Sequence, residues 1–185
     1  MYFRFLTLFL LFLCYSLTIL SNIEAFANGL DGLVIYPDAY NVEWNENSPI
    51  PGSKAVVFYL DIDFPPSELI EFYESRFANQ GASMFPFLGA TREWRTYHKF
   101  HEGNLFRTKE YLSSWWNHEK DLLYSLALRY TTPATLKKDT TKLKIVIQRI
   151  PFSETDYKEK NSGSGLEKQH FFLAAYTALT GELRL

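Results

Sequence analysis

The chain has 185 residues, of which 46% are apolar and 22% are charged. This composition excludes a disordered or collagen-like protein and is sufficient for one domain with its own core. Nineteen basic residues against 21 acidic ones give a formal net charge of −2, so the chain as a whole has no general attraction for nucleic acid. Aromatic residues make up 17% of the chain, which predicts a core rich in aromatic rings.

The N-terminal segment predicts an export signal. Arg4 precedes an apolar run over residues 5–20, and polar residues then lead to Ala25-Phe26-Ala27. The two alanines stand where signal cleavage requires small side chains, so residues 1–27 are expected to be a signal peptide and the protein to be periplasmic or secreted. The alternative is a membrane anchor formed by residues 5–23, although the nearly all apolar stretch 5–20 spans only about 24 Å of a roughly 30 Å hydrocarbon core.

Cys14 is the only cysteine and lies inside this segment. The residue before it is Leu13, whereas lipoprotein processing needs a small residue there, so lipid attachment is not expected. The mature chain is then free of cysteine, which excludes a disulfide framework, a cysteine nucleophile and a thiolate metal site.

The first clear elements are a strand and a helix. Apolar and polar side chains alternate from Ala55 to Phe64, which predicts a half-buried strand. The following Pro65-Pro66-Ser67-Glu68 is typical of a helix start. An apolar stripe then recurs at intervals of four residues, and Gly81 provides the left-handed stop.

The rest of the domain predicts an antiparallel sheet. Residues 89–106 show no period and are expected to be irregular. The expected strands are 82–87 at a sheet edge, 109–116 and 122–130 as a hairpin around the turn 117–121, and 143–150. We therefore expect residues 28–152 to form a single α+β domain, with an antiparallel sheet of about four or five strands packed against one main helix.

The amino-acid composition of the chain changes after residue 152. Residues 153–165 are polar and rich in Gly and Ser, which predicts a flexible linker. Residues 166–185 are expected to form an apolar helical tail that carries Phe171, Phe172 and Tyr176. The apolar side of such a tail must pack on another apolar surface. The candidate surfaces are its own domain, a partner protein and a membrane.

Short motifs between residues 33 and 130 resemble a group of small uncharacterised exported bacterial domains. They are Tyr36-Pro37-Asp38-Ala39, a helix that contains Phe72-Tyr73 and ends at Gly81, and a later Trp115 or Trp116 followed by a strand that closes at Tyr130. The resemblance implies an exported α+β domain without known catalysis, and it assigns no functional residue.

Two polar constellations are candidates for chemistry. Asp61 and Asp63 lie two apart on the polar face of the first strand, with their Cα atoms about 6.6 Å apart, so their carboxyls could serve as an acid pair in glycoside hydrolysis. His98 and His101 have an H-x-x-H spacing, but histidines three apart share a face only on a helix, so they are weak candidates for metal binding.

Aromatic side chains are the stronger candidates for contact with a ligand. Trp115 and Trp116, with Trp94, Tyr97 and Tyr111, are candidates for an aromatic platform. Neighbouring positions of a strand face opposite sides, so one of the two adjacent tryptophans is expected in the core and the other at the surface, at an edge or under the tail.

These observations favour an exported, non-enzymatic binding domain of the cell envelope or secreted space. Trp115, Trp116, Phe171, Phe172 and Tyr176 are its candidate binding residues, and another envelope or secreted protein is the expected partner. The alternatives are an extracytoplasmic hydrolase that uses Asp61 and Asp63 and a membrane-anchored domain. No cofactor, metal or nucleic acid is expected, and the lysines of 137–144 are expected to belong to a solvated loop.

Overall fold

The computed structural model describes residues 32–45, 51–85 and 92–162. The chain divides into two units, residues 1–36 and 37–185, and the fold below is that of the second unit. The expected signal peptide and the tail residues Phe171, Phe172 and Tyr176 lie outside the described residues. Within the described ranges, no helix is long and apolar enough to cross a membrane.

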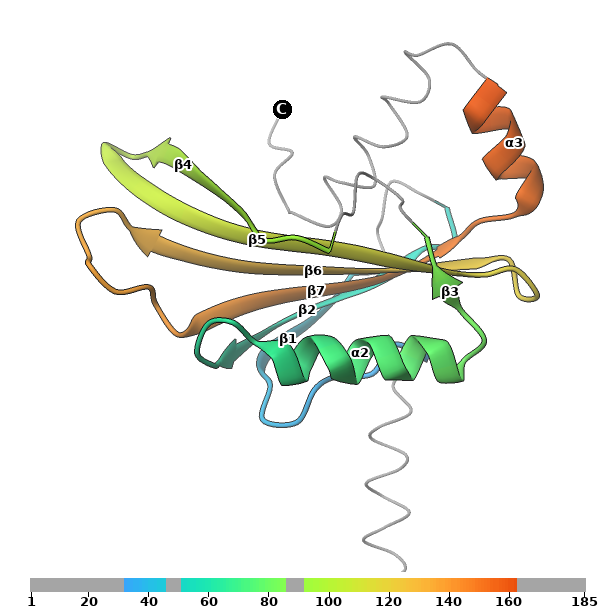
Figure 1. The fold of residues 1–185 in the computed structure, drawn as a ribbon, viewed down its shortest axis with the longest axis horizontal. Helices are drawn as coiled ribbons and strands as arrows, with labels where there is room; N and C mark the ends of the chain where they lie inside the picture. Colours follow the sequence, from blue (N-terminus) through green and yellow to red (C-terminus); the bar gives the residue numbers. More distant parts are fainter. Residues whose placement is uncertain (1–31, 46–50, 86–91, 163–185) are drawn as a thin grey trace, which may run out of the picture. The chain divides into compact units, whose positions relative to one another are not determined.

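The described part of the second unit is an α+β fold built on an antiparallel sheet (Figure 1). The sheet has seven strands in the order β1-β2-β7-β6-β5-β3, and β4 also pairs with β5. The strands are β1 (Tyr40–Asn45), β2 (Lys54–Asp61), β3 (Ser83–Met84), β4 (Arg95–His101), β5 (Asn104–Asn117), β6 (Leu122–Pro133) and β7 (Lys142–Pro151). Two helices, α2 (Ser67–Asn79) and α3 (Glu154–Ser162), accompany it. The expected four or five strands and single helix were thus too few.

β4 is the main correction to the fold. The segment expected to be irregular forms a hairpin with β5, in which His101 pairs with Asn104 across the two-residue turn Glu102-Gly103. Both turn residues have positive φ, 49° and 78°, as a type I′ turn requires. The strand has no apolar alternation because nearly all of its side chains are exposed, so it lacks the periodic signal on which sequence prediction depends.

β1 was missed for a related reason. Its side chains after Tyr40 are all exposed, and the pairing with β2 changes register between Tyr40 and Glu43. Asn41, inside this irregular stretch, has φ of 50°. A solvent-exposed strand with a bulge at an edge of the sheet shows no clear period of two.

The helix α2 confirms the predicted strand, proline turn and helix. It follows Pro66, and it buries Leu69, Tyr73 and Phe77, the predicted stripe. Gly81, with φ of +81°, follows the C-cap residue Gln80, and glycine adopts this left-handed conformation without a steric penalty.

The helix packs on one face of the sheet through aromatic rings. The Phe77 ring centroid lies 4.8 Å from that of Trp115 and 4.8 Å from that of Tyr124. The alternate residues of the central strands complete this core, and Phe58, Leu126 and Ile145 among them are 0% exposed. The apolar face that sequence analysis predicted for β2, β6 and β7 is therefore the one that packs under α2, whereas in the middle of β6 and β7 the opposite face is buried as well.

The segment expected to be a flexible linker contains the helix α3. The backbone N–H of Ser153 donates to the Asp156 carboxylate at 2.9 Å, and the Asp156 N–H donates to the Ser153 hydroxyl at 3.1 Å. This reciprocal capping satisfies two N–H groups at the helix start. Tyr157 then places its ring 5.7 Å from that of Trp116, which attaches α3 to the sheet.

Candidate binding site between β4, β5 and β6

The face of the sheet opposite α2 carries a pocket at the β4 end. Register places Tyr97 opposite Thr108 and Lys99 opposite Phe106 in the β4–β5 hairpin. Thr108 is in turn opposite Thr131 on β6. Because alternate residues of a strand share a face, these side chains all lie on the same side of the sheet.

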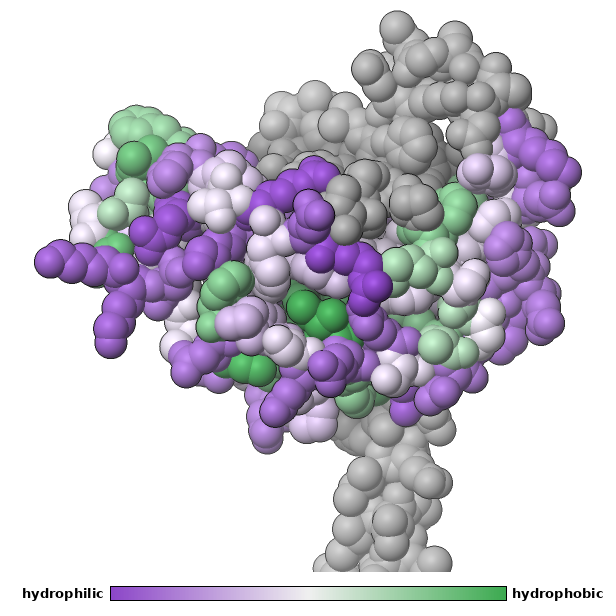
Figure 2. Space-filling model, in the orientation of Figure 1, coloured by the Kyte–Doolittle hydropathy of each residue, from purple (hydrophilic) through white to green (hydrophobic). Residues whose placement is uncertain are grey.

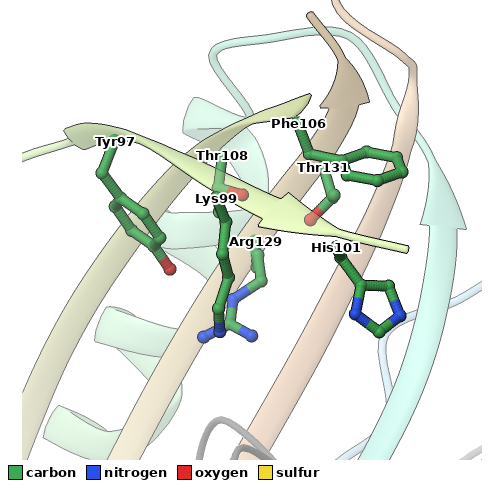
Figure 3. A pocket seen from close by; sticks show the side chains of 7 residues that line it. All are labelled: Tyr97, Lys99, His101, Phe106, Thr108, Arg129 and Thr131. Carbon is green, nitrogen blue, oxygen red and sulfur yellow. The ribbon is translucent and has the colours of Figure 1, made fainter. Parts of the chain in front are cut away.

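The pocket has a volume of about 230 Å³. Its side chains come from β4, β5 and β6 (Figure 3). It is lined by Tyr97, Lys99, His101, Phe106, Thr108, Arg129 and Thr131. We call it the β4–β6 pocket.

Positive charge dominates the β4–β6 pocket. In Figure 3 the Lys99 and Arg129 side chains extend in the same direction. Arg129 also binds Glu110, with its Nη2 atom 2.5 Å and its Nε atom 3.1 Å from one carboxylate oxygen. Lys144 is the register partner of Arg129 on β7 and lies on the same face. The residues that line the pocket thus include two cations, Lys99 and Arg129, and no acidic side chain.

The remaining lining offers apolar surface and hydroxyl groups. Tyr97 and Phe106 provide rings, and Thr108 and Thr131 provide hydroxyls that both donate and accept hydrogen bonds. Within the described ranges, no group of three or more His, Cys, Asp or Glu residues could hold a metal ion. The arrangement is suited to bind an anionic group next to a small apolar group.

The structure does not place Asp61 and Asp63 on one strand face as expected. β2 ends at Asp61. One further hydrogen bond, from the Ile62 N–H to the Thr141 carbonyl, follows the strand, and Asp63 lies beyond it, just before the proline turn. Asp61 accepts a hydrogen bond of 2.8 Å from the Tyr40 hydroxyl, and this bond raises the pKa of Tyr40. The backbone carbonyl of Asp63 accepts a hydrogen bond of 3.3 Å from the Tyr130 hydroxyl. Neither carboxylate lines the β4–β6 pocket.

The two histidines of the H-x-x-H motif lie on one strand, β4, which directs their side chains to opposite faces of the sheet. His98 is opposite Arg107 and His101 is opposite Asn104. Residues three apart on a strand face opposite sides, so the pair does not converge as it would on a helix. His101 lines the pocket, and its Nε2 atom lies 3.6 Å from the Glu102 carboxylate.

Trp115 and Trp116 face opposite sides of β5 as expected, but both indoles are about 3% exposed. Trp115 packs against Phe77 under α2. Trp116 donates from Nε1 to the Phe152 carbonyl at 3.0 Å and is covered by α3. Of the three places expected for the second tryptophan, the open surface is wrong, because each sheet face is covered at this end. The place under the tail of residues 166–185 lies outside the described residues. The role of both tryptophans in ligand contact stays a prediction.

A second cluster of charged and aromatic groups lies on the α2 side of the same strands. The Lys109 Nζ atom is 3.9 Å from the centroid of the Phe64 ring and 2.6 Å from the Asp139 carboxylate. Arg107 binds the same carboxylate at 2.7 Å. Hydrogen bonds from Lys109 and Arg107 lower the pKa of Asp139. These partners satisfy one another, so the cluster is a structural element of the β6–β7 connection.

Sequence analysis named only Tyr97 and His101 among the residues that line the pocket. The remaining lining residues were missed because the segment that becomes β4 was expected to be irregular. A usable signal was present in Glu102-Gly103, since an acidic residue before glycine between two short runs is typical of a two-residue hairpin turn. Comparisons with protein families, curated proteins and solved structures found no match to the chain.

Proposed function

We propose that the protein is a non-enzymatic binding domain that recognises an anionic group through the β4–β6 pocket. One observation carries the proposal: Lys99 on β4 and Arg129 on β6 line the same pocket as two aromatic rings. A cation beside an aromatic ring and a threonine hydroxyl can bind a carboxylate or phosphate and the apolar group attached to it.

The size of the pocket limits the ligand. Its volume of about 230 Å³ is below the roughly 300–1,000 Å³ of pockets that hold drug-sized molecules. The proposed ligand is therefore a single small acid, an acidic side chain or the end of a larger chain. The sequence features that predict export support the further proposal that this group belongs to an envelope or secreted molecule.

The proposal is tested by titrating the protein with small acids. Acetate, benzoate and inorganic phosphate are added to the isotope-labelled chain, and backbone amide shifts are followed by NMR. Saturable shifts are expected in β4, β5 and β6. Lys99→Gln should weaken binding of the best of these acids about tenfold, because a charge-assisted hydrogen bond is lost.

The matched control is Lys120→Gln, which removes an exposed lysine from the β5–β6 turn. It should leave the affinity unchanged. Equal affinity for both variants, or saturable shifts confined to other strands, would contradict the proposed site.

A further inference from the structure

The β4–β5 hairpin ends in a short and well-defined turn. His101 and Asn104 are paired directly across Glu102-Gly103, and the Asn104 side-chain amide donates to the Glu102 carbonyl at 3.2 Å. Gly103 has φ of +78° with no atom within 4 Å of an ideal Cβ position. The positive φ values of both turn residues suit a two-residue hairpin turn, which fixes the positions of the side chains beside it.

Large apolar side chains are exposed at this end of the sheet. Phe100 is 71% exposed, and its register partner Leu105 is 47% exposed. Leu136, in the connection between β6 and β7, is 52% exposed. The Leu105 carbonyl accepts a hydrogen bond of 2.8 Å from the Ala134 N–H, which places the start of the β6–β7 connection beside the first residues of β5. In Figure 2 a hydrophobic area covers the β4–β5 turn.

Positive charge accompanies these apolar side chains. Lys137 and Lys138 directly follow Leu136 and are exposed. The nearby Asp139 is bound by both Arg107 and Lys109, so it does not cancel them. Glu102 is the acidic residue of the turn. We refer to Phe100, Leu105, Leu136, Lys137 and Lys138 together as the hairpin tip.

We infer that the hairpin tip binds the surface of a bilayer that contains anionic lipids. Its rings and aliphatic chains would enter the interfacial region, and its lysines would meet the lipid phosphates. Three apolar side chains offer far less than the roughly 800 Å² per partner of a stable protein interface, whereas reversible membrane binding needs only a small inserted area. The inference uses none of the residues that line the β4–β6 pocket, so the two proposals can fail separately.

The test places an environment-sensitive fluorophore at the hairpin tip of the full chain. In a Cys14→Ser background, the variants Phe100→Cys and Val42→Cys are labelled with a nitrobenzoxadiazole dye. Val42 is the matched control because it is an apolar residue on β1 that is also exposed, at 38%. Vesicles of phosphatidylcholine with phosphatidylglycerol should shift the emission at position 100 to the blue and leave position 42 unchanged. This readout is informative even if residues 5–23 hold the chain at the membrane.

The charged part of the tip is tested with Lys137→Gln/Lys138→Gln in the variant labelled at position 100. Each lysine near an anionic surface contributes about fivefold to binding, so the pair should require at least about tenfold more lipid for half of the emission shift. High salt should have a similar effect.

Three results would overturn the inference. The first is no emission shift at position 100, and the second is an equal shift with pure phosphatidylcholine or at position 42. The third is a soluble protein partner that is lost with Phe100→Ser while vesicles cause no shift, because the tip would then be a protein interface.

Discussion

Glu110 and Arg129 form a largely buried ion pair. Their side chains are 5% and 15% exposed, and the guanidinium binds one carboxylate oxygen through two nitrogens. Removing two charges from water is expensive, so such a pair adds little net stability. It is nevertheless costly to break, because the remaining charge stays buried without compensation. The pair also fixes the position of Arg129 in the β4–β6 pocket.

We expect Glu110→Ala to lower the free energy of unfolding by about 3 kcal/mol, since Arg129 keeps its charge in a largely buried position. The measurement is denaturant unfolding followed by circular dichroism. The control is Glu154→Ala, which breaks an ion pair to Lys158 in which both side chains are more than half exposed. It should be indistinguishable from the unchanged protein. Equal losses of unfolding free energy in the two variants would show that the charge of Arg129 is tolerated in its position without Glu110.

The helix α3 shows how one short motif decides between a linker and a helix. Its residues are strongly polar, and the composition of 153–165 favoured a flexible segment. Ser153 and Asp156 nevertheless have the spacing of a capping box, S-x-x-[DE], which indicates a helix start. The signal was present in the sequence, but it was outweighed by composition.

Ser153→Ala should destabilise α3 by about 1 kcal/mol, because the Asp156 N–H loses its acceptor at the helix start. Hydrogen exchange measured by mass spectrometry should show faster exchange in the first turn of α3 and no change in β6. Thr155→Ala, at an exposed position of the same turn, is the control. Unchanged exchange in the Ser153 variant would mean that Tyr157 packing, not the cap, holds α3 in place.

The strands differ in how far the sequence predicted them. β2 and β7 pair along their length, and both were found because every second side chain is apolar and faces the core under α2. β4 and β1 were not found, since most of their side chains are exposed. Their strand conformation is stabilised by backbone pairing with the next strands along the chain, β5 and β2, and this pairing requires no alternation of apolar side chains.

At the level of the domain, α2 is attached to the sheet mainly through aromatic rings. Phe77 is 1% exposed and contacts Trp115 and Tyr124 from two strands. Tyr73, one turn earlier, is stacked on Phe77 at 6.0 Å. A single ring at this position therefore connects helix, β5 and β6.

Phe77→Ala should lower the free energy of unfolding of the whole domain by about 3–5 kcal/mol, because it removes a buried ring and leaves a cavity between three elements. Phe100→Ala removes the same ring from a site that is 71% exposed and should change the free energy by less than about 0.5 kcal/mol. Both values come from guanidinium unfolding curves. Similar losses would place Phe77 outside the cooperative core.

The sequence by itself determined the α+β class, the helix with its buried stripe, and the hairpin of β5 with β6. These elements carry local signals: a period of two or four, prolines at a helix start and a glycine at its end. Only the tertiary structure decided the β4–β6 pocket. Lys99 and Arg129 are 30 residues apart, and they line one pocket because β5 lies between their strands with its partners in register. Register depends on pairing across the sheet, so no local pattern in either strand specifies it.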